Sequence, residues 1–230
     1  LTGLTQLDDA KLRRALAACL DRPEVCTTVF RDQASPLYSM IPTGMEPYRP
    51  EGVVGPFKVL GDANLTYARS LLTDLGYNNS TNKLEIELWY ETSGHYPSSP
   101  DQAELYKDQF EATGMIEVTL KSADWPSYRI NRNTGVMHVF IYGWYPDYID
   151  PDNYAFLYWA GWLGHHYAKY NATNLYFNMT AAYDVARSSA NETERIELYD
   201  ELEAYAVEDC PMVPIWQGAA WAVTKPNIKG

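Results

Sequence analysis

Two strands separated by a helix constrain the fold of this chain more than any other feature of its sequence. Residues 84–90 alternate apolar with polar or charged side chains, which indicates a strand with one buried face. Helical spacing over 102–113 predicts an amphipathic helix, and the apolar residues of 116–120 alternate again along a second strand. A strand, a helix and a strand in this order form a right-handed unit whose two strands pair in parallel. The sequence therefore predicts an α/β fold.

Further helices are expected on both sides of this unit. Apolar side chains recur at helical spacing in 12–20, and Asn64 is placed to cap a helix that ends near Leu75. Two more helices are predicted over 181–190 and 192–207. Because the chain contains neither an internal repeat nor a linker between domains, we expect residues 1–230 to form a single α/β lobe.

The stretch 137–142 is apolar nearly throughout, as a central strand covered on both faces would be. It leads into 143–154, which reads Gly-Trp-Tyr-Pro-Asp-Tyr-Ile-Asp-Pro-Asp-Asn-Tyr. In open α/β sheets ligands bind beyond the carboxyl ends of the strands. Asp147 is therefore predicted to lie at a binding site if this strand is central.

A carboxylate among aromatic rings suits the binding of a ligand better than its chemical conversion. Asp147 can hold a cationic group through charge-assisted hydrogen bonds. The rings of Trp144, Tyr145 and Tyr148 can then pack against the rest of the ligand. We predict these four residues as the ligand-binding site.

A simpler interpretation of this segment remains open. Asp147, Asp150 and Asp152 could merely begin turns and cap the next helix, as Asp beside Pro often does. Most of the 19 Tyr and 7 Trp residues will fill the core, and of the others we expect Tyr90 and Tyr96 to lie near a ligand.

The balance of charge excludes one class of partner. The chain has 18 basic and 30 acidic residues, a formal net charge of −12, and no basic run compensates locally. Such a chain repels the phosphate backbone of nucleic acids and an anionic membrane surface. Its longest apolar runs also fall far short of the roughly 20 residues that a membrane-spanning helix needs.

The start of the sequence carries no methionine and no signal-peptide pattern, so we expect a fragment of a longer protein. Three cysteines, Cys19, Cys26 and Cys210, allow one disulfide or only buried thiols. Asn-x-Ser/Thr triplets are frequent, which suggests either an exported, glycosylated surface or simply an Asn- and Thr-rich composition. The triplets begin at Asn64, Asn78, Asn79, Asn171, Asn178 and Asn191.

Common catalytic signatures are absent from the sequence. It has no Gly-x-Ser-x-Gly, no Gly-rich phosphate loop, no His-Glu-x-x-His and no Cys-x-x-Cys. His165 and His166 are adjacent and have no nearby carboxylate to orient them, so we predict no metal site and no cofactor. Asp147 and Asp150 could act as a catalytic pair, but nothing in the sequence places two carboxylates across a cleft.

Several short segments recur in the order and spacing typical of one family. They are 12–16, 20–22, 68–77, 112–115, 143–154, 194–199 and 211–214. Each is weak alone, but together they span essentially the entire chain. They resemble the carboxyl-terminal lobe of extracellular solute-binding proteins of family 5, which serve oligopeptide and dipeptide ABC transporters.

This resemblance implies one lobe of a type II periplasmic-binding-protein fold, with a mixed, mostly parallel sheet and helices on both faces. A complete member would be roughly twice as long, with a ligand cleft between two lobes. In peptide-binding members the Asp of the Gly-Trp-x-x-Asp-Tyr segment receives the amino terminus of the ligand, and the Trp lines a side-chain pocket. These positions correspond to Asp147 and Trp144.

The resemblance also implies the biological setting. The protein is expected to be no enzyme but to capture an oligopeptide or related solute by hinge closure. Its partners would be that solute and the membrane permease subunits of an ABC transporter, with the lobe itself monomeric. It would act outside the cytoplasm, in the periplasm or at the cell surface, and be anchored in its full length as a lipoprotein. Two alternatives stay open, namely a lobe for an oligosaccharide or other solute and a carboxylate-dependent hydrolase.

Overall fold

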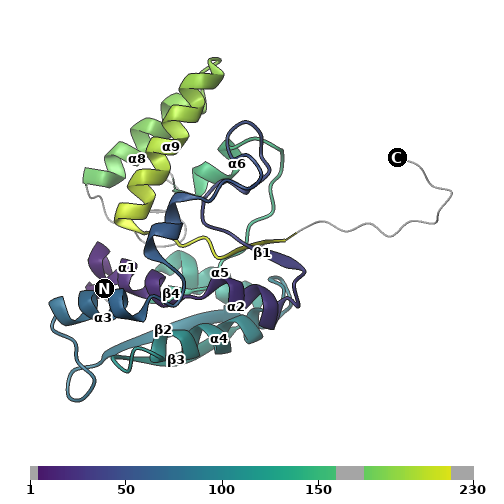
Figure 1. Cartoon of the computed structure of the whole chain (residues 1–230). Coiled ribbons are helices and arrows are strands. Elements are labelled where there is room, and N and C mark those ends of the chain that lie inside the picture. Colours follow the sequence, from purple (N-terminus) through teal and green to yellow (C-terminus); the bar gives the residue numbers. More distant parts are fainter. Residues whose placement is uncertain (1–4, 159–173, 219–230) are drawn as a thin grey trace.

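The computed structural model describes residues 5–158 and 174–218 of the chain. A sheet with packed helices occupies one end of the molecule, and two long helices project from the other end (Figure 1). These helices, α8 (Asn174–Ala186) and α9 (Glu192–Asp209), lie side by side as an antiparallel hairpin. In these two ranges no helix has the length and apolar character needed to cross a membrane.

The main sheet has three parallel strands, and β2 lies in its middle. β2 (Leu84–Glu91) pairs along its full length with β3 (Ile116–Ala123). It also pairs near its carboxyl end with β4 (Val139–Phe140). The helix α4 (Ser99–Glu111) connects β2 to β3, so the predicted strand-helix-strand unit is confirmed.

The predicted central strand over 137–142 is wrong in both length and position. β4 is two residues long and pairs only with one side of β2, so β2 is the central strand of the described sheet. Just before β4, a side chain takes the place of a backbone acceptor: the backbone N–H of Glu87 in β2 donates a hydrogen bond to Nδ1 of His138 at 3.1 Å. Met137 and Ile141 are buried in different hydrophobic clusters, which explains why the segment is apolar although little of it is strand.

Helices cover both faces of the sheet, as predicted. Alternate residues of β2 pack into the main core together with α1 (Ala10–Cys19), α3 (Leu65–Asp74) and α4. Trp89 packs on the opposite face against α5 (Trp125–Thr134). The β2 residues buried on the first face are Leu84, Ile86 and Leu88.

Side-chain caps mark the starts of the helices. Asn64, as predicted, accepts a hydrogen bond from the backbone N–H of Tyr67 at 3.3 Å, and Asn191 caps α9 in the same way. Both asparagines also begin Asn-x-Ser/Thr triplets. Another of the predicted triplets, at Asn171, lies outside the described residues. The last two helices exist as predicted but with other bounds: α8 begins at Asn174 and ends at Ala186 instead of spanning 181–190, and α9 extends to Asp209 instead of ending at 207.

A second hydrophobic core joins the α8–α9 hairpin to the irregular segment 37–60. Met179 of α8 and Leu202 of α9 pack there with Ile41 and Phe57. The shorter elements are η1 (Thr5–Asp8), α2 (Arg22–Glu24), the π-helix η2 (Val25–Val29), η3 (Pro56–Leu60), α6 (Asp152–Ala155) and η4 (Phe156–Tyr158), with the antiparallel pair β1 (Ala34–Pro36) and β5 (Trp216–Gly218).

The cysteines form no disulfide. Cys19, Cys26 and Cys210 are free and buried, which agrees with the expectation of buried thiols. Burial raises the pKa of Cys19 and Cys210 to about 12 and that of Cys26 to about 11. Thiols held in this neutral form are poor nucleophiles and poor metal ligands.

One buried carboxylate ties α9 to the segment 37–60. Glu203 is fully buried, and its Oε1 accepts hydrogen bonds from the backbone N–H groups of Met40 at 2.8 Å and Ile41 at 3.3 Å. Its Oε2 accepts a hydrogen bond from the guanidinium of Arg49, which also pairs with Asp200. Burial raises the pKa of Glu203 to about 7, while Arg49 and the two N–H groups act in the opposite direction.

We predict that Glu203→Gln lowers the free energy of unfolding by about 3 kcal/mol, because it leaves the largely buried Arg49 with only the exposed Asp200 as a partner charge. Urea denaturation at pH 8 measures this change. Glu197→Gln, on the exposed side of the same helix, is the control and should change stability by less than about 0.5 kcal/mol. Equal effects of the two substitutions would contradict a stabilising role for the Glu203–Arg49 pair.

Candidate functional site

The segment between β4 and α6 carries the four predicted site residues. Gly143 opens it, and a steric reason explains the glycine: a Cβ atom here would lie 2.8 Å from Cδ1 of Tyr96. The Tyr96 ring, which is 4% exposed, therefore packs directly against the backbone of the segment. A larger residue at position 143 would have to displace a buried ring.

Trp144 is held in a defined orientation. Its Nε1 donates a hydrogen bond to Oδ1 of Asn153 at 2.9 Å. Its ring meets the Phe156 ring edge to face, with 5.0 Å between centroids and an angle of 67°. On another side Tyr142 lies nearly parallel to it at 6.4 Å. A hydrogen bond and two ring contacts together restrict both χ angles of this side chain.

Asp147 is exposed, and its backbone is fixed by the same asparagine. The N–H of Asp147 donates to Oδ1 of Asn153 at 3.3 Å, so one oxygen accepts hydrogen bonds from both Trp144 and Asp147. Asn153 is only 2% exposed. Asn153, which the sequence analysis did not single out, therefore sets the position of Asp147 relative to the Trp144 ring.

The three aspartates of the segment differ in what their carboxylates contact. Asp150 accepts hydrogen bonds from Arg195 of α9 at 2.6 Å and from the backbone N–H of Asp152 at 2.9 Å. Asp152 accepts one from the hydroxyl of Tyr148. Within the described residues, no hydrogen bond or ion pair involves the carboxylate of Asp147. The carboxylates of Asp150 and Asp152 therefore hold the segment together, and the Asp147 carboxylate is left to contact a ligand.

This division of roles bears on the hydrolase alternative. Glycoside hydrolysis needs two carboxyl groups that face a common substrate, one of them able to give up a proton. The Asp150 carboxylate is instead occupied by Arg195, in an ion pair that anchors the segment to α9. Asp147 and Asp150 do not form such a pair in this structure.

The two remaining predicted residues lie at the surface. Tyr145 is 73% exposed and Tyr148 is 51% exposed. The hydrogen bond from Tyr148 to Asp152, together with partial burial, raises the pKa of the Tyr148 hydroxyl. Ile149 is 89% exposed beside them. The segment therefore presents two rings and an aliphatic side chain to solvent next to Asp147.

An aromatic cluster adjoins Trp144, and the sequence analysis predicted only one of its other members, Tyr96. Tyr142 contacts Trp144 on one side and Tyr96 on the other, with 6.1 Å between the Tyr142 and Tyr96 centroids. Tyr96 in turn meets Trp125 at 5.4 Å. The guanidinium of Arg132, a residue that is 4% exposed, lies 5.2 Å from the Tyr142 centroid and 5.6 Å from that of Trp125.

A positional signal could have found this cluster. Tyr96, Trp125 and Tyr142 each follow the carboxyl end of a different strand of the sheet, namely β2, β3 and β4. Carboxyl ends of parallel strands meet at one edge. Tyr96 was predicted near the ligand and joins the cluster, whereas Tyr90 packs against the main core instead.

Metal binding finds no support in the described part of the chain. Residues 5–158 and 174–218 contain no group of three His, Cys, Asp or Glu side chains that could hold an ion. His165 and His166 lie outside these ranges.

The fold of the chain is shared with solved periplasmic binding proteins. The structure resembles that of the periplasmic murein tripeptide-binding protein MppA in its unliganded open form, with a TM-score of 0.76 and 23% identity over 92% of this chain and 39% of that chain. A solved structure described as a peptide ABC transporter, peptide-binding protein matches with a TM-score of 0.70 and 20% identity, covering 93% of this chain and 92% of that one. The chain thus has the fold of part of a type II periplasmic binding protein.

The family follows from the sequence match. Residues 4–163 match the model of the bacterial extracellular solute-binding proteins, family 5 Middle, and the chain belongs to this family. Among curated relatives, the periplasmic oligopeptide-binding protein OppA of Haemophilus influenzae is 26% identical over 232 residues, or 97% of this chain. The chain spans about 40% of the length of the curated relatives that it matches.

We predict that Asn153→Ala releases Trp144 and Asp147 from their shared acceptor and lowers the free energy of unfolding by about 1 kcal/mol, since two partly buried donors lose their partner. The Trp144 indole N–H and the Asp147 amide should exchange with solvent faster in NMR spectra. Asn133→Ala, at an exposed position of α5, serves as the control and should leave both exchange rates unchanged. Unaltered exchange in Asn153→Ala would contradict the bridging role.

Proposed function

We propose that this chain is the ligand-capturing lobe of a substrate-binding protein that delivers peptides to an ABC importer. Asp147 anchors the amino terminus of the peptide, and Trp144, Tyr145 and Tyr148 form the wall beside it. The observation that carries the proposal is the Asp147 carboxylate, which is exposed and uncommitted among residues that are otherwise fixed. An ammonium group supplies the donors and the charge that this carboxylate lacks.

Family membership and the names of the relatives support this assignment. The chain belongs to a family of solute-binding proteins, and the matched relatives include an oligopeptide-binding and a murein peptide-binding protein. Neither the arrangement of Asp147 and Asp150 nor this family favours covalent chemistry, so the proposed role is binding without turnover.

The proposed protein has two lobes, of which residues 1–230 form one. Two observations support this view. The chain spans only about 40% of the length of the curated relatives, and a solved peptide-binding protein chain matches it over 92% of its own length. The ligand would bind between the lobes, which close over it by hinge motion. The partners are then a peptide and the permease subunits. The location is extracytoplasmic, as in the periplasmic relatives, with a lipid anchor in the full-length protein.

The test compares peptides with a free and a blocked amino terminus, using the full-length protein that contains this lobe. Trialanine should raise the unfolding temperature by mass action, whereas maltotriose should not. Asp147→Asn should weaken trialanine binding about 10- to 100-fold in calorimetric titration, because a charge-assisted hydrogen bond is lost. N-acetyl-trialanine should bind the wild type about as weakly as trialanine binds the variant.

Asp108→Asn is the matched control, because Asp108 is an exposed aspartate on α4, far along the chain from the segment. It should leave trialanine affinity unchanged. If Asp147→Asn weakened the free and acetylated peptides equally, the amino-terminal anchor would be refuted. Stabilisation by maltotriose but not by any peptide would instead favour the oligosaccharide-binding alternative.

A further inference from the structure

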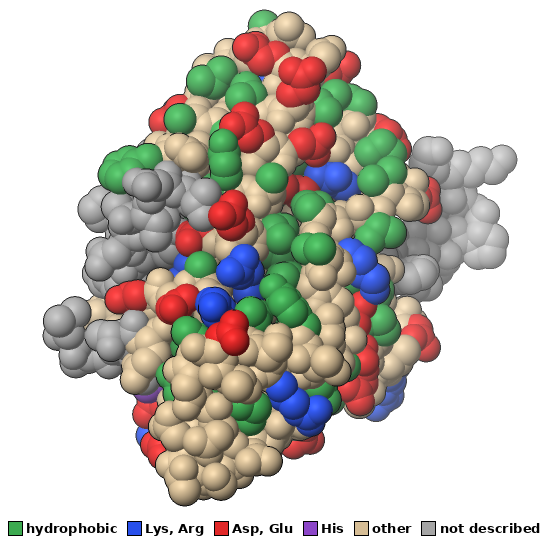
Figure 2. Space-filling view, turned by 60° about the vertical axis from the view of Figure 1, so that its left-hand side comes forward, with side chains coloured by type: hydrophobic (Ala, Val, Ile, Leu, Met, Phe, Trp, Pro, Cys, Tyr) green, Lys and Arg blue, Asp and Glu red, His purple; other side chains and the backbone are tan. Residues whose placement is uncertain are grey.

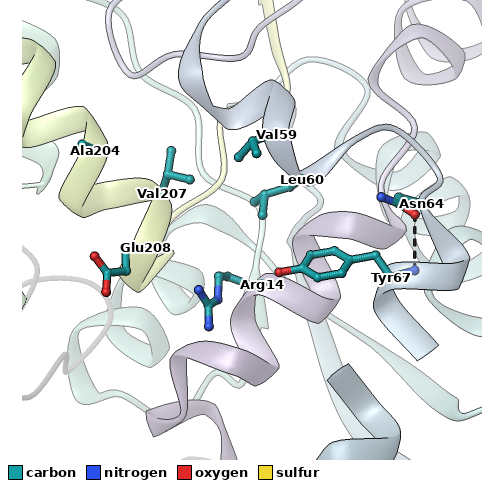
Figure 3. Close-up of a pocket in the computed structure, with 8 residues that line it drawn as sticks. All are labelled: Arg14, Val59, Leu60, Asn64, Tyr67, Ala204, Val207 and Glu208. Atoms are coloured by element: carbon teal, nitrogen blue, oxygen red, sulfur yellow. Dashed lines mark hydrogen bonds between the residues drawn. The ribbon is translucent and has the colours of Figure 1, made fainter. Parts of the chain in front are cut away.

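A pocket of about 530 Å³ lies between α1, η3, α3 and α9, and none of its residues belongs to the segment that carries Asp147 (Figure 3). This volume lies within the range of small-molecule sites, roughly 300–1,000 Å³. The residues that line it are Arg14, Val59, Leu60, Asn64, Tyr67, Ala204, Val207 and Glu208.

The strongest feature of this pocket is an arginine with an unsatisfied donor. The Nε of Arg14 is buried and has no hydrogen-bond partner in the described part of the chain. The preceding residue, Arg13, instead donates hydrogen bonds to Asp209 and Leu7. The side chain as a whole is only partly buried, and no hydrogen bond or ion pair of Arg14 occurs within the described residues, so the accessible end of its guanidinium can pair with an anionic group that enters the pocket.

Two further polar groups lie along α3. Figure 3 shows the hydroxyl end of Tyr67 pointing toward Arg14. The Oδ1 of Asn64 is engaged as the cap of α3, which leaves the NH₂ group of that side chain to donate. The cation and the hydroxyl can donate to one ligand group, and a planar guanidinium is well matched to a carboxylate, whereas Asn64 lies at the other end of the Tyr67 side chain (Figure 3).

The rest of the pocket is apolar and comes from two other elements. η3 contributes Val59 and Leu60, and α9 contributes Ala204 and Val207. Val59 is 73% exposed, which is unusual for a large aliphatic side chain and leaves apolar surface uncovered at the pocket mouth. A ligand that covers Val59 while its head group reaches Arg14 must be amphipathic.

Negative charge around the pocket limits the charge of the ligand. Glu208 of α9 lines the pocket. Figure 2 shows acidic side chains gathered over the α8–α9 hairpin, and the chain has a formal net charge of −12. Each additional negative charge on a ligand therefore adds repulsion, whereas a single carboxylate can pair with Arg14.

We propose that this pocket is a second binding site, separate from the Asp147 segment, for a small amphipathic monocarboxylate. The carboxylate bonds to Arg14 and Tyr67, and the apolar body covers Val59, Leu60 and Val207. Binding is reversible and involves no covalent step. Glu208 selects against dianions.

The experiment uses the 230-residue chain and three probes, phenylacetate, hexanoate and inorganic phosphate, followed by NMR titration of the backbone amides. Phenylacetate and hexanoate should give saturable shifts at α1, η3 and the start of α3, and phosphate should give none. Arg14→Gln should weaken phenylacetate binding at least about tenfold, because its charge-assisted bonds are lost. Arg129→Gln, an exposed arginine on α5, is the control and should have no effect.

The reverse effect is expected at Glu208. Glu208→Gln should tighten phenylacetate binding about two- to fivefold at low salt and less at high salt, because repulsion is removed. A purely structural role for either residue would not produce opposite changes in affinity. The proposal is overturned if neither carboxylate gives saturable shifts at the pocket, if Arg14→Gln leaves affinity unchanged, or if phosphate binds as well as phenylacetate.

Discussion

The packing of β2 between its neighbours is the constraint on which the rest of the structure depends. One face of this strand is buried in the core with α1, α3 and α4, and on the other face Trp89 packs against α5. Because β3 and β4 both pair with it in parallel, all three strands end at the same edge. The segments that follow the strands are thereby brought together, and these segments contain the aromatic cluster and the Asp147 segment.

At that edge, positions are set by a small number of polar contacts rather than by regular secondary structure. Oδ1 of Asn153 holds both Trp144 and the backbone of Asp147. The Asp150–Arg195 ion pair then ties the segment to α9, so the hairpin also helps to position it. A loop fixed in this way can present a side chain to solvent without losing order, because these contacts hold its backbone and its other aspartates.

The sequence predicted those parts of the fold that local pattern determines. Alternation revealed β2, and the cap at Asn64 revealed α3, because both signals depend on neighbouring residues only. The stretch 137–142 misled for a physical reason: its side chains are apolar because they enter two clusters, and the pattern cannot distinguish this from a strand buried on both faces. The position of Trp125 just after a strand could have been used, because the ends of parallel strands meet at one edge. The roles of Asn153 and Arg132 depend on side-chain contacts in three dimensions, for which composition and spacing contain no signal.

The exposure of Asp147 has an energetic consequence for the proposed function. In water an ion pair at 4 Å is worth about 1 kcal/mol, but at an effective dielectric constant near 20 it is worth about 4 kcal/mol. An exposed carboxylate on one lobe is therefore a weak anchor, and it becomes a strong one only when a second surface removes water from it. The exposed side chains of Tyr145, Tyr148 and Ile149 provide apolar surface that such closure would cover. Affinity in the proposed protein thus arises from closure of two lobes around the ligand, and the uncommitted carboxylate gives the direction in which the ligand binds.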